Sequence, residues 1–134
     1  MDQDKITNTE TIILSWIKSS DDNFDTMLDL YGVKRYNWAL FLGHLCLEKL
    51  LKAYFVKVNK MHAPLLHNLS RIAELSELQL SKEQKNNFAT ITTFNINARY
   101  DDYKQSFDQK CTKEFADVWI IIIKQYRQWI KELL

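Results

Sequence analysis

Hydrophobic residues recur at the spacing of α-helices in four long segments and one short segment of the chain. These segments are about Thr9 to Leu30, about Asn37 to Val58, the short residues 67–78, residues 81–94, and about Thr112 to the end of the sequence. The second segment is apolar on almost every side, which is typical of a central helix. The pattern predicts five helices and leaves residues 95–103 outside them.

Residues near the ends of these segments predict where the helices start and stop. Gly32 suits the C-terminal cap of the first helix, because glycine tolerates the left-handed conformation common there. Ser81 and Thr112 suit N-caps, because their hydroxyls accept hydrogen bonds from free backbone amides. The polar run "SSDD", residues 19–22, interrupts the apolar stripe of the first helix and is expected to kink or loosen it.

The last predicted helix has the clearest apolar stripe. Ile121 and Ile123 lie away from the centre of that stripe, and they are candidates for a dimer face. A helix that is apolar beyond one face is either central or covered by a partner chain. The stripe itself is predicted to be core and comprises Phe115, Val118, Trp119, Ile122, Tyr126, Trp129, Ile130 and Leu133.

Composition points to long helices within one domain. The 134 residues include 2 Gly and 1 Pro, while 46% are hydrophobic and 26% are charged. A sheet protein of this length needs many turns and therefore more turn-forming residues. We expect an all-α fold in a single domain over residues 1–134, with its core at about residues 9–133.

The sequence also indicates where the protein is located and whether it binds a metal or a cofactor. The polar first ten residues differ from a signal peptide, and no apolar run approaches the roughly 20 residues needed to span a bilayer. We therefore expect a cytoplasmic protein without a membrane segment. Cys46 and Cys111 lie in helical patterns without metal-like spacing, which favours free, buried thiols. Neither a metal nor a cofactor is predicted.

Charge is unevenly distributed along the chain, although the net charge is +1. Residues 1–33 carry seven acidic and two basic side chains, whereas residues 34–134 carry 10 acidic and 16 basic ones. Six of those basic residues fall within residues 34–60. Such an excess suits an anionic ligand, but a basic face is also common on ordinary solvated surfaces.

Three segments in a fixed order resemble the HEPN family of small helical domains. They are "ALFLGHLCLEKLLKAYFV" at residues 39–56, "HNLSRIAEL" at residues 67–75, and "NARYDDY" at residues 97–103 before the last long helix. The resemblance spans roughly residues 9–130. It implies an up-and-down bundle of four long helices plus one short helix, and a homodimer.

The resemblance also implies a function connected with nucleotides or RNA. Family members are often encoded beside a small nucleotidyltransferase, and some are ribonuclease toxins or antiviral effectors. Others are non-catalytic and bind a nucleotide, a nucleic acid or the partner protein. Active members share an arginine that is followed four to six residues later by a histidine.

That ribonuclease motif is incomplete in this chain. None of the arginines Arg35, Arg71, Arg99 and Arg127 is followed by a histidine four to six residues later. Cleavage of RNA through its 2′-hydroxyl requires a base for that proton and a cation for the phosphate charge. Arg99 offers the cation, so His44, His62 or His67 would have to approach it through the fold.

The candidate ligand-binding residues come from two regions. Arg99, Asp102 and Tyr103 belong to the polar stretch "NINARYDDY", residues 95–103. Arg99 either grips a phosphate or carboxylate or forms an internal ion pair with Asp102. Tyr103, like Tyr100, either stacks a base or fills the end of the bundle.

A polar row on the second helix supplies the other candidates. His44, Glu48 and Lys52 follow at intervals of four residues and therefore share one helix face. The row either faces Arg99 across a cleft or forms an exposed ion pair, and His44 stands where the family often has glutamine. His67 with Asn68 either joins that cleft or caps the third helix.

The sequence thus favours a non-catalytic HEPN-like protein of a toxin–antitoxin or defence type. It would bind a nucleotide or nucleic-acid phosphate, a nucleotidyltransferase partner, or both. One alternative is a divergent, metal-independent ribonuclease toxin. Another is a purely structural interaction module in which Asp102 holds Arg99.

Overall fold

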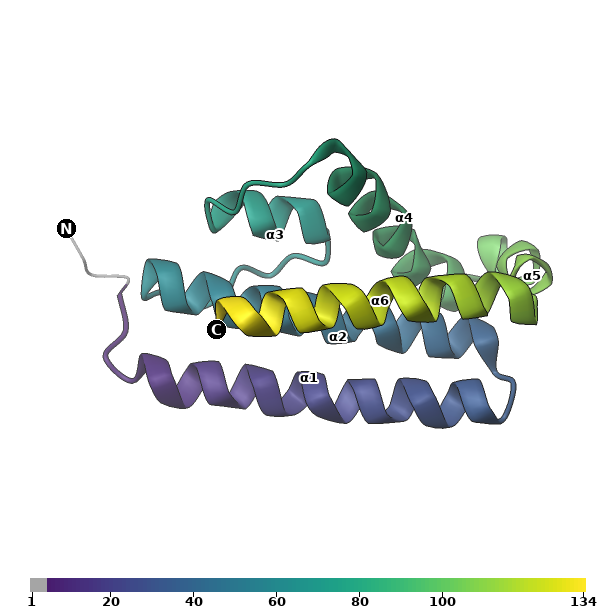
Figure 1. Cartoon of the computed structure of the whole chain (residues 1–134), viewed down its shortest axis with the longest axis horizontal. Helices are drawn as coiled ribbons and strands as arrows, with labels where there is room; N and C mark the ends of the chain where they lie inside the picture. Colours follow the sequence, from purple (N-terminus) through teal and green to yellow (C-terminus); the bar gives the residue numbers. More distant parts are fainter. Residues whose placement is uncertain (1–4) are drawn as a thin grey trace.

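A computed structural model describes residues 5–134 of the chain, and this part is built from helices (Figure 1). This confirms the predicted all-α fold. One isolated bridge joins the backbones of Lys5 and Met61. The helices are α1 (Thr9–Gly32), α2 (Tyr36–Asn59), α3 (Leu69–Leu75), α4 (Lys82–Arg99), α5 (Asp101–Lys110) and α6 (Lys113–Leu133).

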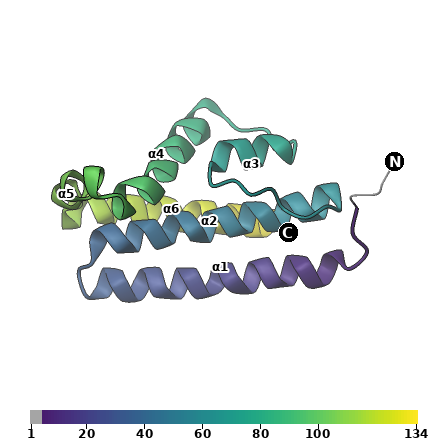
Figure 2. The ribbon, with the colours of Figure 1, turned by 180° about the vertical axis from the view of Figure 1, so that it is seen from behind.

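The long helices α1, α2 and α6 lie lengthwise, and α2 occupies the centre. α2 and α6 run in the same direction, opposite to α1, while α4 crosses obliquely on the side away from α1 (Figures 1 and 2). α2 contacts all five other helices. This arrangement explains why α2 is apolar around most of its circumference.

Gly43 allows the close packing of α2 between its two long neighbours. A Cβ atom at this position would lie 2.6 Å from Cδ1 of Ile123 on α6 and 3.1 Å from Sδ of Met27 on α1. Both of those side chains are fully buried. The missing side chain therefore makes room for the core contacts of α1 and α6.

The helix boundaries differ from the predictions in several places. α1 continues without interruption through residues 19–22, where the buried Ser20 hydroxyl donates a 2.8 Å hydrogen bond to the carbonyl of Cys46 on α2. Gly32 is the last residue of α1, and Val33 is its cap. α3 is shorter than predicted, and α5 was not predicted. The N-caps at Ser81 and Thr112 are confirmed by their hydrogen bonds to backbone amides.

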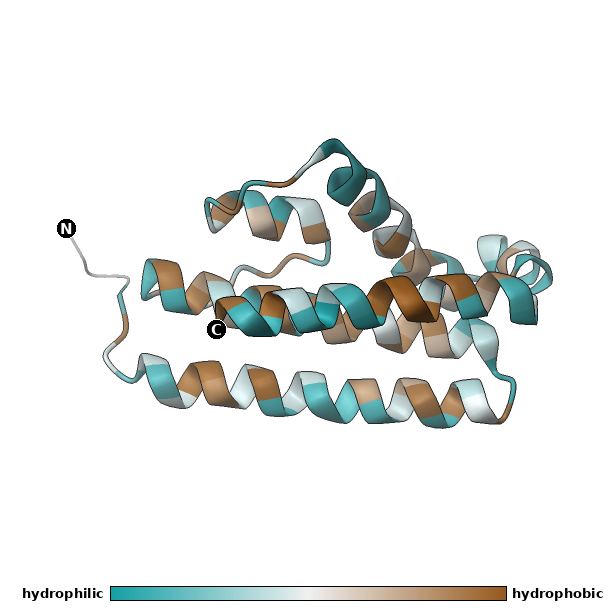
Figure 3. Ribbon diagram, viewed as in Figure 1, coloured by the Kyte–Doolittle hydropathy of each residue, from teal (hydrophilic) through white to brown (hydrophobic). Residues whose placement is uncertain are grey.

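The predicted dimer face on the last helix is only partly exposed. Ile123 is fully buried in the core, so the prediction for this residue was wrong. Ile121 is 56% exposed, and Val118, which was predicted to be core, is 53% exposed. Hydrophobic residues gather in this part of α6 (Figure 3).

Salt bridges and an aromatic contact join α1 to α6. The guanidinium of Arg127 lies over the ring of Phe24, 3.8 Å from its centroid, and donates a 3.1 Å hydrogen bond to Asp21. Lys131 lies 2.7 Å from the same carboxylate. Burial raises the pKa of Asp21, but the hydrogen bonds from Lys131 and Arg127 outweigh it, so the pKa lies below its usual value.

Both cysteines are free and buried, as the sequence predicts. Burial raises the pKa of the Cys46 thiol, and it raises that of Cys111 to about 12. Among the described residues, none of the helices combines the length and hydrophobicity required to cross a membrane.

Candidate functional site around Arg99

The stretch "NINARYDDY" is the junction of two helices rather than a segment outside them. Residues 95–99 form the last turn of α4, and residues 101–103 form the first turn of α5. Tyr100 alone separates the helices, with an extended backbone at φ −92° and ψ 129°. The junction places Arg99 at the surface, at the end of α4.

The guanidinium of Arg99 is held in place by contacts other than an ion pair with any of the described carboxylates. Its Nε donates a 3.0 Å hydrogen bond to the backbone carbonyl of Asn95, and its Nη2 donates one to the side-chain oxygen of Asn95. The Cζ atom lies 5.6 Å from the ring centroid of Phe41 and 5.4 Å from that of Tyr100. Within residues 5–134, Arg99 forms no ion pair, so the proposed pairing with Asp102 is wrong.

Asn95 connects Arg99 to the polar row of α2. Asn95 is buried, and its Nδ2 lies 3.4 Å from Nδ1 of His44. Nε2 of His44 lies 2.8 Å from the backbone carbonyl of His67. Because a carbonyl only accepts, Nε2 carries the proton and Nδ1 accepts from the amide. Burial lowers the pKa of His44, which keeps this imidazole neutral.

A second polar group consists of Glu48 and Lys52, further along α2, and His67 from the segment before α3. Glu48 accepts hydrogen bonds from Nδ1 of His67 at 2.9 Å and from Nζ of Lys52 at 3.0 Å. Glu48 and Lys52 are buried, whereas the His67 ring is largely exposed. Lys52 also lies 5.5 Å from the ring centroid of Trp16. The interpretation as an exposed Glu–Lys pair is therefore wrong.

The other predicted site residues lie around the junction. Tyr103 and Asp102 are exposed in the first turn of α5, and no side-chain hydrogen bond or ion pair joins either to the described residues. Asn68 caps α3 by accepting a hydrogen bond from the amide of Arg71, as the capping alternative predicts. The adjacent His67 instead contacts the α2 row through its ring and its carbonyl.

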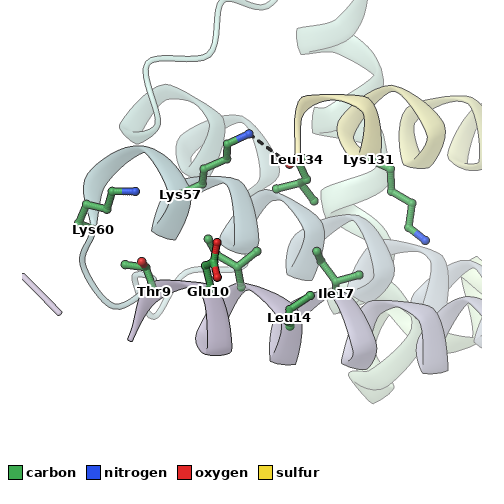
Figure 4. A pocket seen from close by; sticks show the side chains of 9 residues that line it. Thr9, Glu10, Leu14, Ile17, Lys57, Lys60, Lys131 and Leu134 are labelled. Carbon is green, nitrogen blue, oxygen red and sulfur yellow. Dashed lines mark hydrogen bonds between the residues drawn. The ribbon is translucent and has the colours of Figure 1, made fainter. Parts of the chain in front are cut away.

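The two larger of the cavities found among residues 5–134 open at opposite ends of the molecule. One, of about 640 Å³, lies between the start of α1 and the ends of α2 and α6 and is lined by Lys57, Lys60 and Glu10 (Figure 4). In it, Lys57 donates hydrogen bonds to the backbone carbonyls of Leu133 and Leu134. None of the ligand-binding residues predicted from the sequence lines this cavity or the one beside Arg99. The other, of about 480 Å³, lies beside the Arg99 junction, between α2 and α5.

Two residues that matter at this site were not singled out in the sequence. Asn95 holds Arg99, and Phe41 lies against its guanidinium. Tyr100 was a candidate, and its exposed ring lies beside the same guanidinium rather than filling the end of the bundle. The four-residue spacing of Asn95 and Arg99 is a signal for such a contact, but only once residues 95–99 are known to be helical.

The arrangement supports anion binding. It presents a fixed, exposed cation on an aromatic surface, and no acidic side chain of residues 5–134 is paired to it. Among residues 5–134, no group of three or more His, Cys, Asp or Glu side chains is placed to hold a metal ion.

Comparison with protein families identifies residues 13–133 as a HEPN domain, in agreement with the three segments noted in the sequence. Neither a comparison with curated proteins nor one with solved structures found a match. The family match covers nearly the whole chain and supports a role connected with nucleotides or RNA. This chain belongs to the HEPN domain family.

Proposed function

We propose that this HEPN protein binds the phosphate of a nucleotide or nucleic acid at Arg99 without cleaving it. The observation that carries the proposal is the exposed guanidinium, which is fixed by Asn95 and free of any carboxylate in the described residues. Nη1 makes no hydrogen bond within residues 5–134, so it remains available to an oxygen of the ligand. Arginine donates well to phosphate because its charge assists the hydrogen bond.

The anchoring of Arg99 favours binding energetically. A mobile arginine loses side-chain entropy when it grips a ligand, at a cost of about 0.5–1.5 kcal/mol. In this protein, the contacts to Asn95, Phe41 and Tyr100 already restrict the side chain before the ligand arrives. Arg99 has therefore already lost much of this side-chain entropy in the unbound protein, and it loses less when the ligand binds.

The experiment is fluorescence anisotropy with a labelled single-stranded RNA and with labelled nucleotides. Arg99→Ala should weaken binding about 10- to 100-fold, because a hydrogen bond to a charged group contributes roughly 1.5–3 kcal/mol. Arg71→Ala is the matched control, since that exposed arginine is already paired with Glu74. Equal losses in both variants, or no binding by the unchanged protein, would contradict the proposal.

We also propose that the protein is a homodimer with Ile121 and Val118 in its interface. Both are exposed on α6, and large exposed apolar side chains that lie together mark association surfaces. Light scattering should give twice the chain mass of 16.0 kDa, and Ile121→Lys should shift it toward the monomer. A monomer mass for the unchanged protein at high concentration would exclude the dimer.

We further propose that the protein has a nucleotidyltransferase partner and acts in a toxin–antitoxin or defence system. The support for this is that HEPN proteins are often encoded beside a small nucleotidyltransferase. Co-expression with a neighbouring nucleotidyltransferase should yield a complex that survives size-exclusion chromatography. Elution of the two proteins at separate volumes would exclude a stable pair. The cytoplasmic location stays a prediction.

A ribonuclease is a second candidate function, favoured by the contact between His67 and Glu48. Glu48 accepts from Nδ1 of His67 and orients the exposed ring, which leaves Nε2 to take the 2′-hydroxyl proton. The purified protein should then cleave RNA, and His67→Ala should abolish cleavage. Intact RNA after prolonged incubation, together with normal growth of cells that express the protein, would exclude this function.

A further inference from the structure

The cavity of about 480 Å³ next to the Arg99 junction has the size of a small-molecule site, since such sites range over roughly 300–1,000 Å³. One of its walls is Trp38, in the first turn of α2. The Trp38 ring packs edge-on against Phe41, with centroids 5.9 Å apart, and Arg99 lies against that same Phe41. Two successive ring contacts thus connect the guanidinium with the cavity.

Asn37 lines the cavity with a polar side chain that makes no hydrogen bond to any of the described residues. The residue as a whole is only 7% exposed, but its polar atoms are not among the fully buried, unpartnered atoms of residues 5–134, so the carboxamide is open to the cavity. A carboxamide offers both donors and acceptors. Asn37 therefore presents unused donor and acceptor capacity to whatever fills the cavity.

The charged residues around the cavity narrow the class of ligand. Arg35 and Lys104 contribute cations, Asp101 and Asp108 contribute carboxylates, and within residues 5–134 none of the four forms an ion pair. A bare phosphate would be repelled by the two carboxylates. An apolar ligand would remove water from all four charged side chains and offer them no hydrogen bonds. A polar ligand with separate donor and acceptor edges avoids both costs.

We propose that this cavity binds the nucleobase of the ligand whose phosphate is held by Arg99, and that guanine is the preferred base. This inference rests on the proposed function. Guanine accepts hydrogen bonds at O6 and N7, which arginine or lysine supplies, and it donates from its amino group, which a carboxylate accepts. The cavity of this protein combines both kinds of side chain with the Asn37 carboxamide.

Trp38 supplies the surface against which the base stacks. Nζ of Lys104 lies 5.2 Å from the Trp38 ring, so a cation occupies that neighbourhood of the indole. Stacking of a base on an aromatic side chain contributes about 1–3 kcal/mol. A stacked base displaces the flexible Lys104 side chain, whose ammonium then turns to the acceptor edge of the base.

The test is isothermal titration calorimetry with the 5′-monophosphates of guanosine, adenosine, cytidine and uridine, and with ribose 5-phosphate. The full chain should bind the guanosine nucleotide about tenfold more tightly than the uridine nucleotide, as expected for one good pair of hydrogen bonds. Asn37→Ala and Asp101→Asn should each bring that ratio close to one without changing the affinity for ribose 5-phosphate.

Glu114→Gln is the matched control, because Glu114 is an exposed acidic residue in the first turn of α6 that does not line the cavity. It should leave the base preference unchanged. If all four nucleotides bind equally and Arg99→Ala removes their binding, the inference is wrong and the proposed function stands. If none of the phosphate compounds binds, the proposed function fails as well.

Discussion

Two arginines of this protein lie over aromatic rings, one at the contact of α1 with α6 and one at the junction of α4 with α5. Arg127 covers Phe24 and is paired with Asp21, to which Lys131 also binds. Arg99 lies against Phe41 and Tyr100, and its hydrogen bonds go to a neutral asparagine. Both arginines lie against aromatic rings, but of the two only Arg127 is paired with a carboxylate in the part of the chain that the structure describes.

The difference separates a structural arginine from a binding arginine. The charge of Arg127 is balanced by Asp21 within the fold, so this residue contributes chiefly to stability. Asn95 fixes the position of Arg99 without neutralising it, and the charge remains available to an anion. Mutation of Arg127 should therefore lower the stability of the fold, whereas mutation of Arg99 should weaken ligand binding.

Arg127→Ala should give the largest loss of stability, about 2 kcal/mol in the free energy of unfolding, because the contacts to Phe24 and Asp21 both disappear. Thermal denaturation should show a melting temperature lower by roughly 6–10 °C. Arg71→Ala is the control, since the Arg71–Glu74 pair is exposed on both sides and should contribute less than about 1 kcal/mol. A melting temperature equal to that of the unchanged protein would remove the structural role of Arg127.

Asn95→Ala should affect both properties at once. The free energy of unfolding should fall by about 1–2 kcal/mol, because His44 loses its buried hydrogen-bond partner. Affinity for RNA should fall several-fold, because Arg99 is no longer held. Asn86→Ala, on the exposed side of the same helix, should change neither quantity. If affinity stays constant while stability falls, Asn95 does not position Arg99.

The two regions should lose stability in different pH ranges. His44 has a pKa below its usual 6.5, so the unfolded chain binds the proton more readily and stability falls as the pH drops below about 6.5. The free energy of unfolding at pH 5.5 should be lower than that at pH 7.5 by up to about 1 kcal/mol because of this residue.

His44→Gln should flatten that dependence, whereas the exposed His62→Gln should not. Asp21 also has a lowered pKa, so its contribution is present above about pH 4 and is lost only under more acidic conditions. An unchanged slope between pH 7.5 and 5.5 in His44→Gln would show that other groups cause the dependence.

A carboxylate placed beside Arg99 should make it resemble Arg127. Ile96 is exposed on α4, three residues before Arg99, and that spacing puts the two side chains close together. Ile96→Glu should weaken RNA binding by about two- to fivefold, with stability within about 0.5 kcal/mol of the original. Ile96→Gln provides the uncharged control, and equal binding by the two variants would show that charge balance is not what distinguishes the arginines.

The long helices could be predicted because their apolar residues repeat at helical spacing. The caps at Ser81, Thr112 and Asn68 could be predicted because their side-chain oxygens accept hydrogen bonds from nearby backbone amides. α5 could not be predicted in this way, because Phe107 is its only buried residue among those the structure describes. Phe107 packs against Phe94, with centroids 5.6 Å apart, so a tertiary contact supports this helix.

The candidate site was predictable only in part. Arg99 stood out in a polar stretch, and His44, Glu48 and Lys52 stood out on an apolar helix. Their actual partners depend on how α4 and the segment before α3 pack against α2. No local pattern in the sequence could pair His67 with Glu48, which lies 19 residues away.

The two buried thiols have a practical consequence. Cys46 and Cys111 are shielded, and their raised pKa values leave little thiolate at neutral pH, so both should react slowly with maleimides. A cysteine introduced at the exposed Tyr103 or Ile121 can then be labelled selectively in the native chain. A dye at position 103 would report on ligand binding near Arg99, and a spin label at position 121 would report on self-association through α6.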